Sequence, residues 1–166
     1  MDKLEKIWLI DDDEDEHVLV RHALEKAQIS IALEVFSDAV GAMRALEQLE
    51  GDFPGLIVCD LKMPGMSGIE FLDWLRASPF GVIPVVIRSN SGLQPDVTRA
   101  FEHGANCYVQ KGRTIETLQK NWKLLLEFWS ATCTPTVRVS GRLTLAEDAN
   151  SKLNNNASGG KRVDAS

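Results

Sequence analysis

The feature that most constrains the fold of this chain is a short apolar run that recurs five times, each time followed by a helical stretch. The runs lie at 7–10, 33–36, 55–60, 84–87 and 107–110. Segments this short and this apolar are typical of strands buried in a parallel sheet. Strands that alternate with helices predict an α/β fold, in which a five-stranded, doubly wound parallel sheet carries helices on both faces.

The stretches between and after these runs have apolar residues at helical spacing. Helices are expected at about 14–27, at 40–46, through 71–75, at 95–103 and at 114–131. Asp13 is expected to cap the first helix, and Ser37 or Asp38 the second. We therefore predict one folded domain over residues 1–131.

Polar side chains follow four of the five runs. They are Asp11, Asp12, Asp60, Ser89 and Lys111. Each has an ordinary explanation when taken alone, such as helix capping, solvation of a strand end or an exposed lysine. Because all strands of a parallel sheet end at the same edge, where open α/β folds place their sites, we expect these side chains to lie together.

The residue types in this predicted site indicate phosphoryl chemistry. Three ionised carboxylates cannot share a small pocket unless a positive charge compensates them, and Mg²⁺ with oxygen ligands does so. One carboxylate can then act as a nucleophile towards phosphorus. Lys111 would supply an ammonium group and Ser89 a hydroxyl for the remaining phosphoryl oxygens.

Composition limits the partners that the chain can bind. The net charge is −6 and the isoelectric point is near 5.1, which offers no broad basic surface for a nucleic acid. No apolar run approaches the ~20 residues of a membrane span, and residues 1–5 do not resemble a signal peptide. Cys59, Cys107 and Cys133 share no metal-binding spacing. We expect a cytoplasmic protein that binds neither nucleic acid nor membrane directly.

The composition changes after Cys133. Residues 132–166 contain few large apolar side chains, and 154–160 is rich in Asn, Gly and Ser. A polar C-terminal tail that is largely flexible is therefore expected. Only 137–139 and 143–145 alternate like strand pieces, so a short hairpin or docked arm remains an alternative.

The last helix carries two apolar faces. Its core-facing stripe is expected to consist of Ile115, Leu118, Trp122, Leu125 and Trp129. Leu124 and Phe128 fall on roughly the opposite face, one turn apart. Because an isolated domain would expose that pair, we expect either a homodimer through this helix or cover by the tail.

Four segments together resemble the response-regulator receiver domains of two-component signalling. They are 8–13, 59–68, 84–89 and 104–111, and the resemblance covers roughly residues 5–131 in order and with the family's spacing. It implies a flavodoxin-like fold and a phosphoryl group accepted from a histidine kinase or a small phosphodonor. The chain would be a signalling switch rather than an enzyme, with self-catalysed phosphotransfer and autodephosphorylation only.

The resemblance also implies a role for each site residue. Asp60 would be the phosphoacceptor. Asp12 and Asp60 would bind Mg²⁺ directly together with the backbone carbonyl of Lys62, and Asp11 would act through water. Lys111 would bind the phosphoryl group.

Two further residues match the family's switch. Ser89 corresponds to the switch hydroxyl, and Tyr108 to the aromatic ring that rotates with it. By this resemblance, a new dianion on Asp60 would draw Ser89 inward and remodel the surface around 95–131.

Three positions depart from the family's pattern. Ser89 replaces a more common threonine, Asn90 stands where alanine is frequent, and Gly112 stands where a proline usually follows the lysine. A cis bond before glycine would cost about 2.5–4 kcal/mol, so a trans bond or a more mobile loop is expected after Lys111.

No output domain is recognised in the chain, so we expect a stand-alone receiver that signals through its surface. The Glu127-Phe128-Trp129 ending resembles regulators paired with phytochrome-type histidine kinases. Two alternatives stay open. One is a receiver-like docking module that is not phosphorylated, and the other is an aspartate-nucleophile phosphohydrolase. The second would need an acid two residues after Asp60, where this chain has Lys62.

Overall fold

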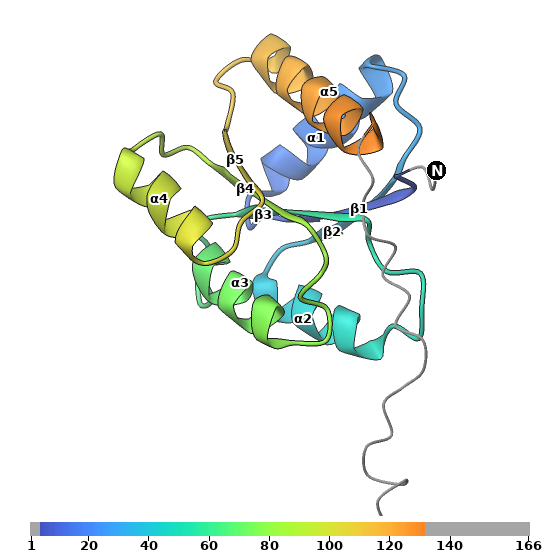
Figure 1. The fold of residues 1–166 in the computed structure, drawn as a ribbon. Helices are drawn as coiled ribbons and strands as arrows, with labels where there is room; N and C mark the ends of the chain where they lie inside the picture. Colours follow the sequence, from blue (N-terminus) through green and yellow to red (C-terminus); the bar gives the residue numbers. More distant parts are fainter. Residues whose placement is uncertain (1–3, 132–166) are drawn as a thin grey trace, which may run out of the picture.

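The computed structural model describes residues 4–131, which form five strands alternating with five helices. The strands are β1 (Lys6–Ile10), β2 (Ala32–Phe36), β3 (Leu56–Asp60), β4 (Val85–Ser89) and β5 (Cys107–Gln110). The helices are α1 (Glu14–Lys26), α2 (Ala39–Gln48), α3 (Gly68–Ala77), α4 (Gln94–Glu102) and α5 (Ile115–Ala131). All strand pairs are parallel and their order is β2-β1-β3-β4-β5. The predicted doubly wound sheet is confirmed (Figure 1).

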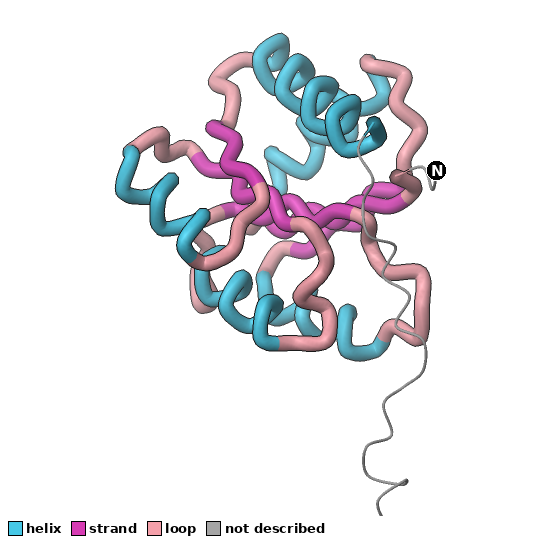
Figure 2. Tube along the Cα trace, viewed as in Figure 1, coloured by secondary structure: helices cyan, strands magenta, loops and turns pink. Residues whose placement is uncertain are grey.

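Helices cover both faces of the sheet (Figure 2). Two apolar cores lie between these helices and the sheet. One core packs α1 and α5 against β1, β3 and β4, and Trp122 is its largest buried side chain from a helix. The other core joins α2, α3 and α4 to the opposite face, with Trp8 and Phe71 buried in it. Every residue of β3 and β4 is buried, because both strands lie inside the sheet and carry helices on each side.

Side chains expected to cap helices do so. Asp13 accepts a hydrogen bond from the backbone N–H of Asp15, and Asp38, rather than Ser37, caps α2. A capping box between Ser67 and Glu70 begins α3 just after the strand end at Asp60. These caps set where α1, α2 and α3 begin and so position the loops between the preceding strand ends and these helices.

The core stripe predicted for α5 is wrong at one residue. Leu118, Trp122 and Leu125 are buried, whereas Ile115 is 45% exposed. Ile115 is the first residue of the helix, and burial begins one turn later. Leu126 joins the buried face instead.

The prediction for the tail at 132–166, including the strand-like pieces within it, lies outside the described residues. Within residues 4–131, none of the helices combines the length and the apolar character that a membrane crossing requires.

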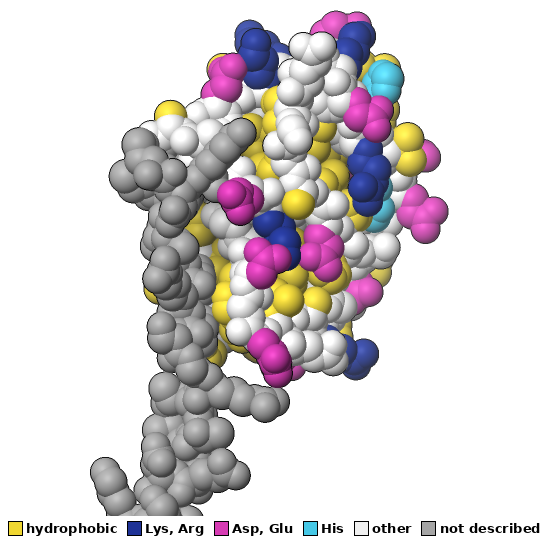
Figure 3. Space-filling view, turned by 90° about the vertical axis from the view of Figure 1, so that its right-hand side faces the viewer, with side chains coloured by type: hydrophobic (Ala, Val, Ile, Leu, Met, Phe, Trp, Pro, Cys, Tyr) yellow, Lys and Arg dark blue, Asp and Glu magenta, His cyan; other side chains and the backbone are white. Residues whose placement is uncertain are grey.

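Figure 3 shows the face on the right-hand side of Figure 1, where the chain enters β1. On this face Lys and Arg side chains are interspersed with Asp and Glu and form no single basic patch.

Candidate functional site

Four strands bring polar residues to one edge of the sheet. Asp60 is the last residue of β3 and Ser89 the last of β4, while Asp11 directly follows β1 and Lys111 directly follows β5. Because β3 lies between β1 and β4, Asp60 stands at the middle of this edge. The sheet thus assembles residues that are up to a hundred positions apart in sequence.

Three carboxylates form an acidic cluster at this edge. Asp11, Asp12 and Asp60 each place one carboxylate oxygen within 4.8 Å of the others. Asp11 is 1% exposed and Asp60 8%, whereas Asp12 is exposed. Burial raises the pKa of the Asp60 carboxyl above its ordinary value, Lys111 opposes that rise and Asp11 adds to it. The cluster therefore holds more negative charge than the fold compensates easily.

Lys111 is the cation within this cluster. Its Nζ lies 2.7 Å from Oδ2 of Asp11 and 3.5 Å from Oδ1 of Asp60, and its side chain is 3% exposed. The backbone N–H of Lys111 donates a hydrogen bond to the carbonyl of Ser89, 2.7 Å away, which fixes the end of β5 against β4. The peptide bond between Lys111 and Gly112 is trans. Lys111 thus lies beside Asp11 and Asp60 at this edge of the sheet.

Two glycines allow the backbone to approach the site closely. A Cβ on Gly68 would lie 2.2 Å from the backbone oxygen of Asp60, so only glycine lets α3 begin against the end of β3. A Cβ on Gly112 would lie 2.8 Å from the backbone nitrogen of Leu118. Gly112 therefore lets the loop after β5 pass close to the first turns of α5.

Ser89 and Tyr108 both contact the loop after β4. Ser89 is buried, and its Oγ accepts a hydrogen bond from the backbone N–H of Ser91. The hydroxyl of Tyr108 donates to the carbonyl of Ser91 at 2.8 Å. Tyr108 is thus tied to the β4–α4 loop and is not part of the acidic cluster. Sequence reasoning gave Ser91 no role in this connection.

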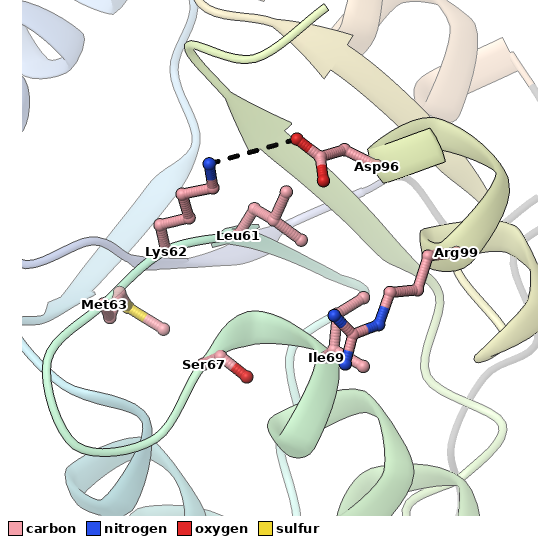
Figure 4. A pocket seen from close by; sticks show the side chains of 7 residues that line it. All are labelled: Leu61, Lys62, Met63, Ser67, Ile69, Asp96 and Arg99. Atoms are coloured by element: carbon pink, nitrogen blue, oxygen red, sulfur yellow. Dashed lines mark ion pairs between the residues drawn. The ribbon is translucent and has the colours of Figure 1, made fainter. Parts of the chain in front are cut away.

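Ser91 also connects this loop to α4. Its hydroxyl donates a short hydrogen bond to Oδ2 of Asp96, in the first turn of the helix. The same carboxylate oxygen lies 4.0 Å from Nζ of Lys62, two residues after Asp60 (Figure 4). Polar contacts therefore link the start of α4 to both the β3 and the β4 ends.

A pocket of about 260 Å³ opens beside this connection, between the β3–α3 loop and α4 (Figure 4). Its lining comprises Leu61, Lys62, Met63, Ser67, Ile69, Asp96 and Arg99. The carboxylates of the acidic cluster do not line it. Lys62 stands where a phosphohydrolase would need an acid, and its side chain is 73% exposed.

Sequence reasoning missed one buried charge at the site. Arg88, the residue before Ser89, has a side chain that is 3% exposed and lies 3.8 Å from Asp11 and 2.7 Å from Glu16. A charged residue inside the otherwise apolar run of β4 was the signal that could have identified it.

The donor set at this edge suits a hard divalent cation. All three candidate ligands are carboxylates, and oxygen ligands of this kind hold Mg²⁺ or Mn²⁺ in proteins. Asp12, the exposed member, is open to solvent for an entering ion. Asp11, Asp12 and Asp60 are thus the residues that could hold a metal.

The doubly wound sheet carries an acidic cluster and a buried lysine at its carboxyl edge, and these side chains could hold a divalent cation beside an anionic group. Residues 7–123 match the model of the response regulator receiver domain family. The chain belongs to this family, whose members are the phosphoacceptors of two-component signalling.

Individual relatives agree with this assignment. Response regulator Rcp1 of a Synechocystis species is 32% identical over 134 residues, which is 77% of this chain and 90% of that protein. The crystal structure of the phosphorylated cyanobacterial phytochrome response regulator RcpA superimposes with a TM-score of 0.71 at 30% identity, covering 78% of this chain and 96% of that one. A structure of the Mn²⁺-bound form of Rcp1 gives a TM-score of 0.69 at 31% identity, with coverage of 78% and 97%.

Proposed function

We propose that Asp60 is the phosphoacceptor of this receiver and that Lys111 binds the phosphoryl group once it has been transferred. The observation that carries this proposal is the position of Lys111, whose buried ammonium lies between Asp11 and Asp60 at the middle of the sheet edge. A buried cation beside a carboxylate of raised pKa is suited to a group that gains negative charge there.

The transfer itself is a displacement at phosphorus. A carboxylate oxygen of Asp60 forms a bond to phosphorus while the bond between phosphorus and the donor nitrogen breaks. The electron pair of that bond stays with the nitrogen, which takes up a proton as it leaves. The three remaining phosphoryl oxygens then meet Lys111 and the hydroxyl of Ser89.

The metal in this proposal is Mg²⁺, which neutralises phosphoryl oxygens and carboxylates when bound. Asp12 and Asp60 would hold it directly with the backbone carbonyl of Lys62, and Asp11 would contribute through water. The three-carboxylate cluster supports this set of ligands. The Mn²⁺ in the Rcp1 structure supports a divalent ion in a related receiver.

The switch is proposed to run through Ser89 and Tyr108. A phosphoryl group on Asp60 offers the Ser89 hydroxyl a charged acceptor, and the N–H of Ser91 then loses its present acceptor. Because Tyr108 and Asp96 both bond to Ser91, the loop and the start of α4 would shift together.

The proposed donor is a sensor histidine kinase in the cytoplasm. The similarity to RcpA, a phytochrome response regulator, supports a phytochrome-type kinase. The acidic net charge supports a protein that binds neither nucleic acid nor membrane directly.

Phosphorylation by a small phosphodonor tests this function. Protein incubated with phosphoramidate and Mg²⁺ is expected to gain one phosphoryl mass by intact-mass spectrometry, and hydroxylamine should remove it. Asp60→Asn should abolish the adduct, whereas Asp73→Asn, an exposed aspartate on α3, should not. Failure of the wild-type protein to gain this mass would favour the docking module. Continuous release of phosphate from many phosphomonoesters would instead favour the phosphohydrolase.

We further propose that α5 forms a homodimer or is covered by the tail. Leu124 and Phe128 are 54% and 59% exposed, one turn apart on the helix. An apolar pair of this size on a helix surface supports a contact in solution. Sedimentation of the full chain and of a chain ending at residue 131 should differ from that of the same chains carrying Leu124→Asp and Phe128→Asp. An unchanged monomer in all four samples would contradict both versions.

A further inference from the structure

Arg88 is a charged side chain inside the protein that the proposed phosphotransfer does not use. It lies in β4 next to Ser89, and alternation along the strand places it on the same face as Val86, in the core that α1 and α5 cover. A guanidinium buried among apolar side chains is costly unless acidic or aromatic groups compensate it. The groups around it therefore indicate what it does.

The groups around Arg88 come from the acidic cluster and from both helices of this face. Its Nη2 donates a hydrogen bond to Oε2 of Glu16 in α1, 2.7 Å away. The guanidinium carbon lies 5.8 Å from the ring centroid of Trp122 in α5. Its Nη1 lies 3.8 Å from Oδ2 of Asp11 and has no hydrogen-bond acceptor within residues 4–131. Arg88 thus connects the acidic cluster to α1 and α5.

The same oxygen of Asp11 faces two cations. Lys111 approaches it to 2.7 Å and Arg88 to 3.8 Å. Lys111 also lies 3.5 Å from Asp60, so this lysine is shared between two carboxylates. A second positive charge beside Asp11 weakens the attraction between Asp11 and Lys111, so Lys111 is freer to contact Asp60. It also makes the electrostatic potential of the whole cluster less negative.

We propose that Arg88 is a positioning residue for this site. It neutralises part of the charge of Asp11 from the α1–α5 side and so leaves Lys111 available to a phosphoryl group on Asp60. This inference rests on the proposed function of Asp60 and Lys111. It predicts two effects of opposite sign when the charge of Arg88 is removed.

The first effect is tighter binding of a divalent cation, because the three carboxylates then keep Lys111 but lose their second neighbouring positive charge. The second is slower phosphorylation, because Asp11 holds Lys111 more firmly and an anionic donor meets a more negative site. A role for Arg88 in folding alone would weaken cation binding and phosphorylation together.

Arg88→Gln and Arg88→Lys test the proposal in the full chain. We would measure Mn²⁺ binding by the electron paramagnetic resonance of free Mn²⁺, and the rate of phosphorylation by phosphoramidate by intact mass. Arg88→Gln is expected to bind Mn²⁺ roughly three- to tenfold more tightly and to be phosphorylated several-fold more slowly. Arg88→Lys should keep both values within about twofold, since it retains the charge. Weaker or unchanged Mn²⁺ binding by Arg88→Gln would overturn the proposal.

Two further variants separate the effect of the Arg88 charge from a loss of stability. Because Arg88→Gln leaves Glu16 buried without its partner, the double variant Arg88→Gln/Glu16→Gln removes both charges, and its Mn²⁺ affinity should lie between that of Arg88→Gln and that of the wild type. Arg76→Gln removes a part-buried arginine whose hydrogen bonds go to carbonyl oxygens such as that of Gly104, so it should lower stability without changing Mn²⁺ affinity. A gain in Mn²⁺ affinity for Arg76→Gln would contradict the role of Arg88. A wild-type protein that binds Mn²⁺ but is not phosphorylated would refute the proposed function, while the Mn²⁺ titrations would still decide whether Arg88 sets the charge at Asp11.

Discussion

Helices α4 and α5 lie on opposite faces of the sheet, and the protein holds them in different ways. The buried side chains of α5 are Leu118, Trp122, Leu125 and Leu126. In α4 the buried side chain is that of Ala100. Leu93, which precedes the helix, and Phe101 within it are 67% and 49% exposed. Apolar burial therefore secures α5, whereas polar contacts through Asp96 hold the start of α4.

This difference shows which helix a charge at Asp60 can move. The buried leucines of α5 carry no charge or hydrogen bond that a new phosphoryl group would change. Ser91 and Lys62, which contact the start of α4, are both close in sequence to strand ends that form the site. We therefore expect α4 to shift on phosphorylation and α5 to act as a fixed support. Four experiments test this difference and the effect of the charge on Asp60.

The largest expected effect comes from truncating matched leucines. Leu126→Ala in α5 removes a side chain that is 3% exposed and should lower the free energy of unfolding by about 2–5 kcal/mol. Leu93→Ala, at the start of α4, removes one that is 67% exposed and should change it by no more than about 0.5 kcal/mol. Urea denaturation measures both values. Similar losses for the two variants would show that α4 is held as firmly as α5.

The next effect concerns the glycines that precede the two helices. Gly112→Ala places a Cβ 2.8 Å from the backbone of α5, and this overpacking should cost about 1–3 kcal/mol. Gly92→Ala, before α4, meets only the side chain of Gln110 at 3.0 Å, which can turn away. Thermal unfolding should therefore distinguish the two variants. Equal melting temperatures would mean that the loop before α5 adapts as readily as the loop before α4.

A smaller effect is expected from the polar contacts of α4. Ser91→Ala removes the hydrogen bond to Asp96, worth about 0.5–1.5 kcal/mol. Amide hydrogen exchange in Gln94–Glu102 should rise roughly two- to tenfold, with no change in Ile115–Ala131. Asp96→Asn provides a second variant of the same contact. Faster exchange in α5 alone would reverse the assignment of the fixed and the movable helix.

The smallest effect concerns the charge of Asp60 itself. Because burial raises the pKa of this carboxyl in the folded state, its ionised form destabilises the fold above that pKa. Asp60→Asn should therefore unfold at a higher urea concentration than the wild type at pH 7. The advantage should disappear below about pH 3.9, where the carboxyl is neutral in both folded and unfolded protein. Mg²⁺ should reduce the difference at pH 7, since it binds the wild type more tightly than a variant that lacks one of the three carboxylates. A lower midpoint for Asp60→Asn at pH 7 would contradict this account.

Much of the fold could be predicted because local patterns and the sheet agree. The apolar run ending at Asp60 is a strand buried on both faces, and Asp13 caps the helix where its position predicted. Strand ends were predictable within a residue or two, so the gathering of Asp11, Asp60 and Lys111 at one edge followed from parallel topology alone.

Other features depended on contacts between distant segments. Ile115 matches the helical stripe of α5 but is exposed. It is the first residue of the helix, and burial in α5 begins one turn later, at Leu118. Arg88 lies in β4 at a position where the strand pattern predicts an apolar side chain. Its burial could not be predicted, because its partner Glu16 is 72 residues away in the sequence. Ser91 lies in a polar loop, and nothing in the sequence around it predicts its hydrogen bonds with Tyr108 of β5 and Asp96 of α4.

The alternation of strands and helices, the acidic residues at the ends of β1 and β3 and the lysine after β5 can all be predicted from the sequence. They follow from side-chain periodicity and from the shared edge of parallel strands, which are local or topological properties. Contacts in the folded protein establish how Lys111 is shared between Asp11 and Asp60, that Arg88 lies beside Asp11, and that polar contacts hold the start of α4. Those outcomes depend on distances of a few ångströms between segments far apart in the chain, which no pattern along it records.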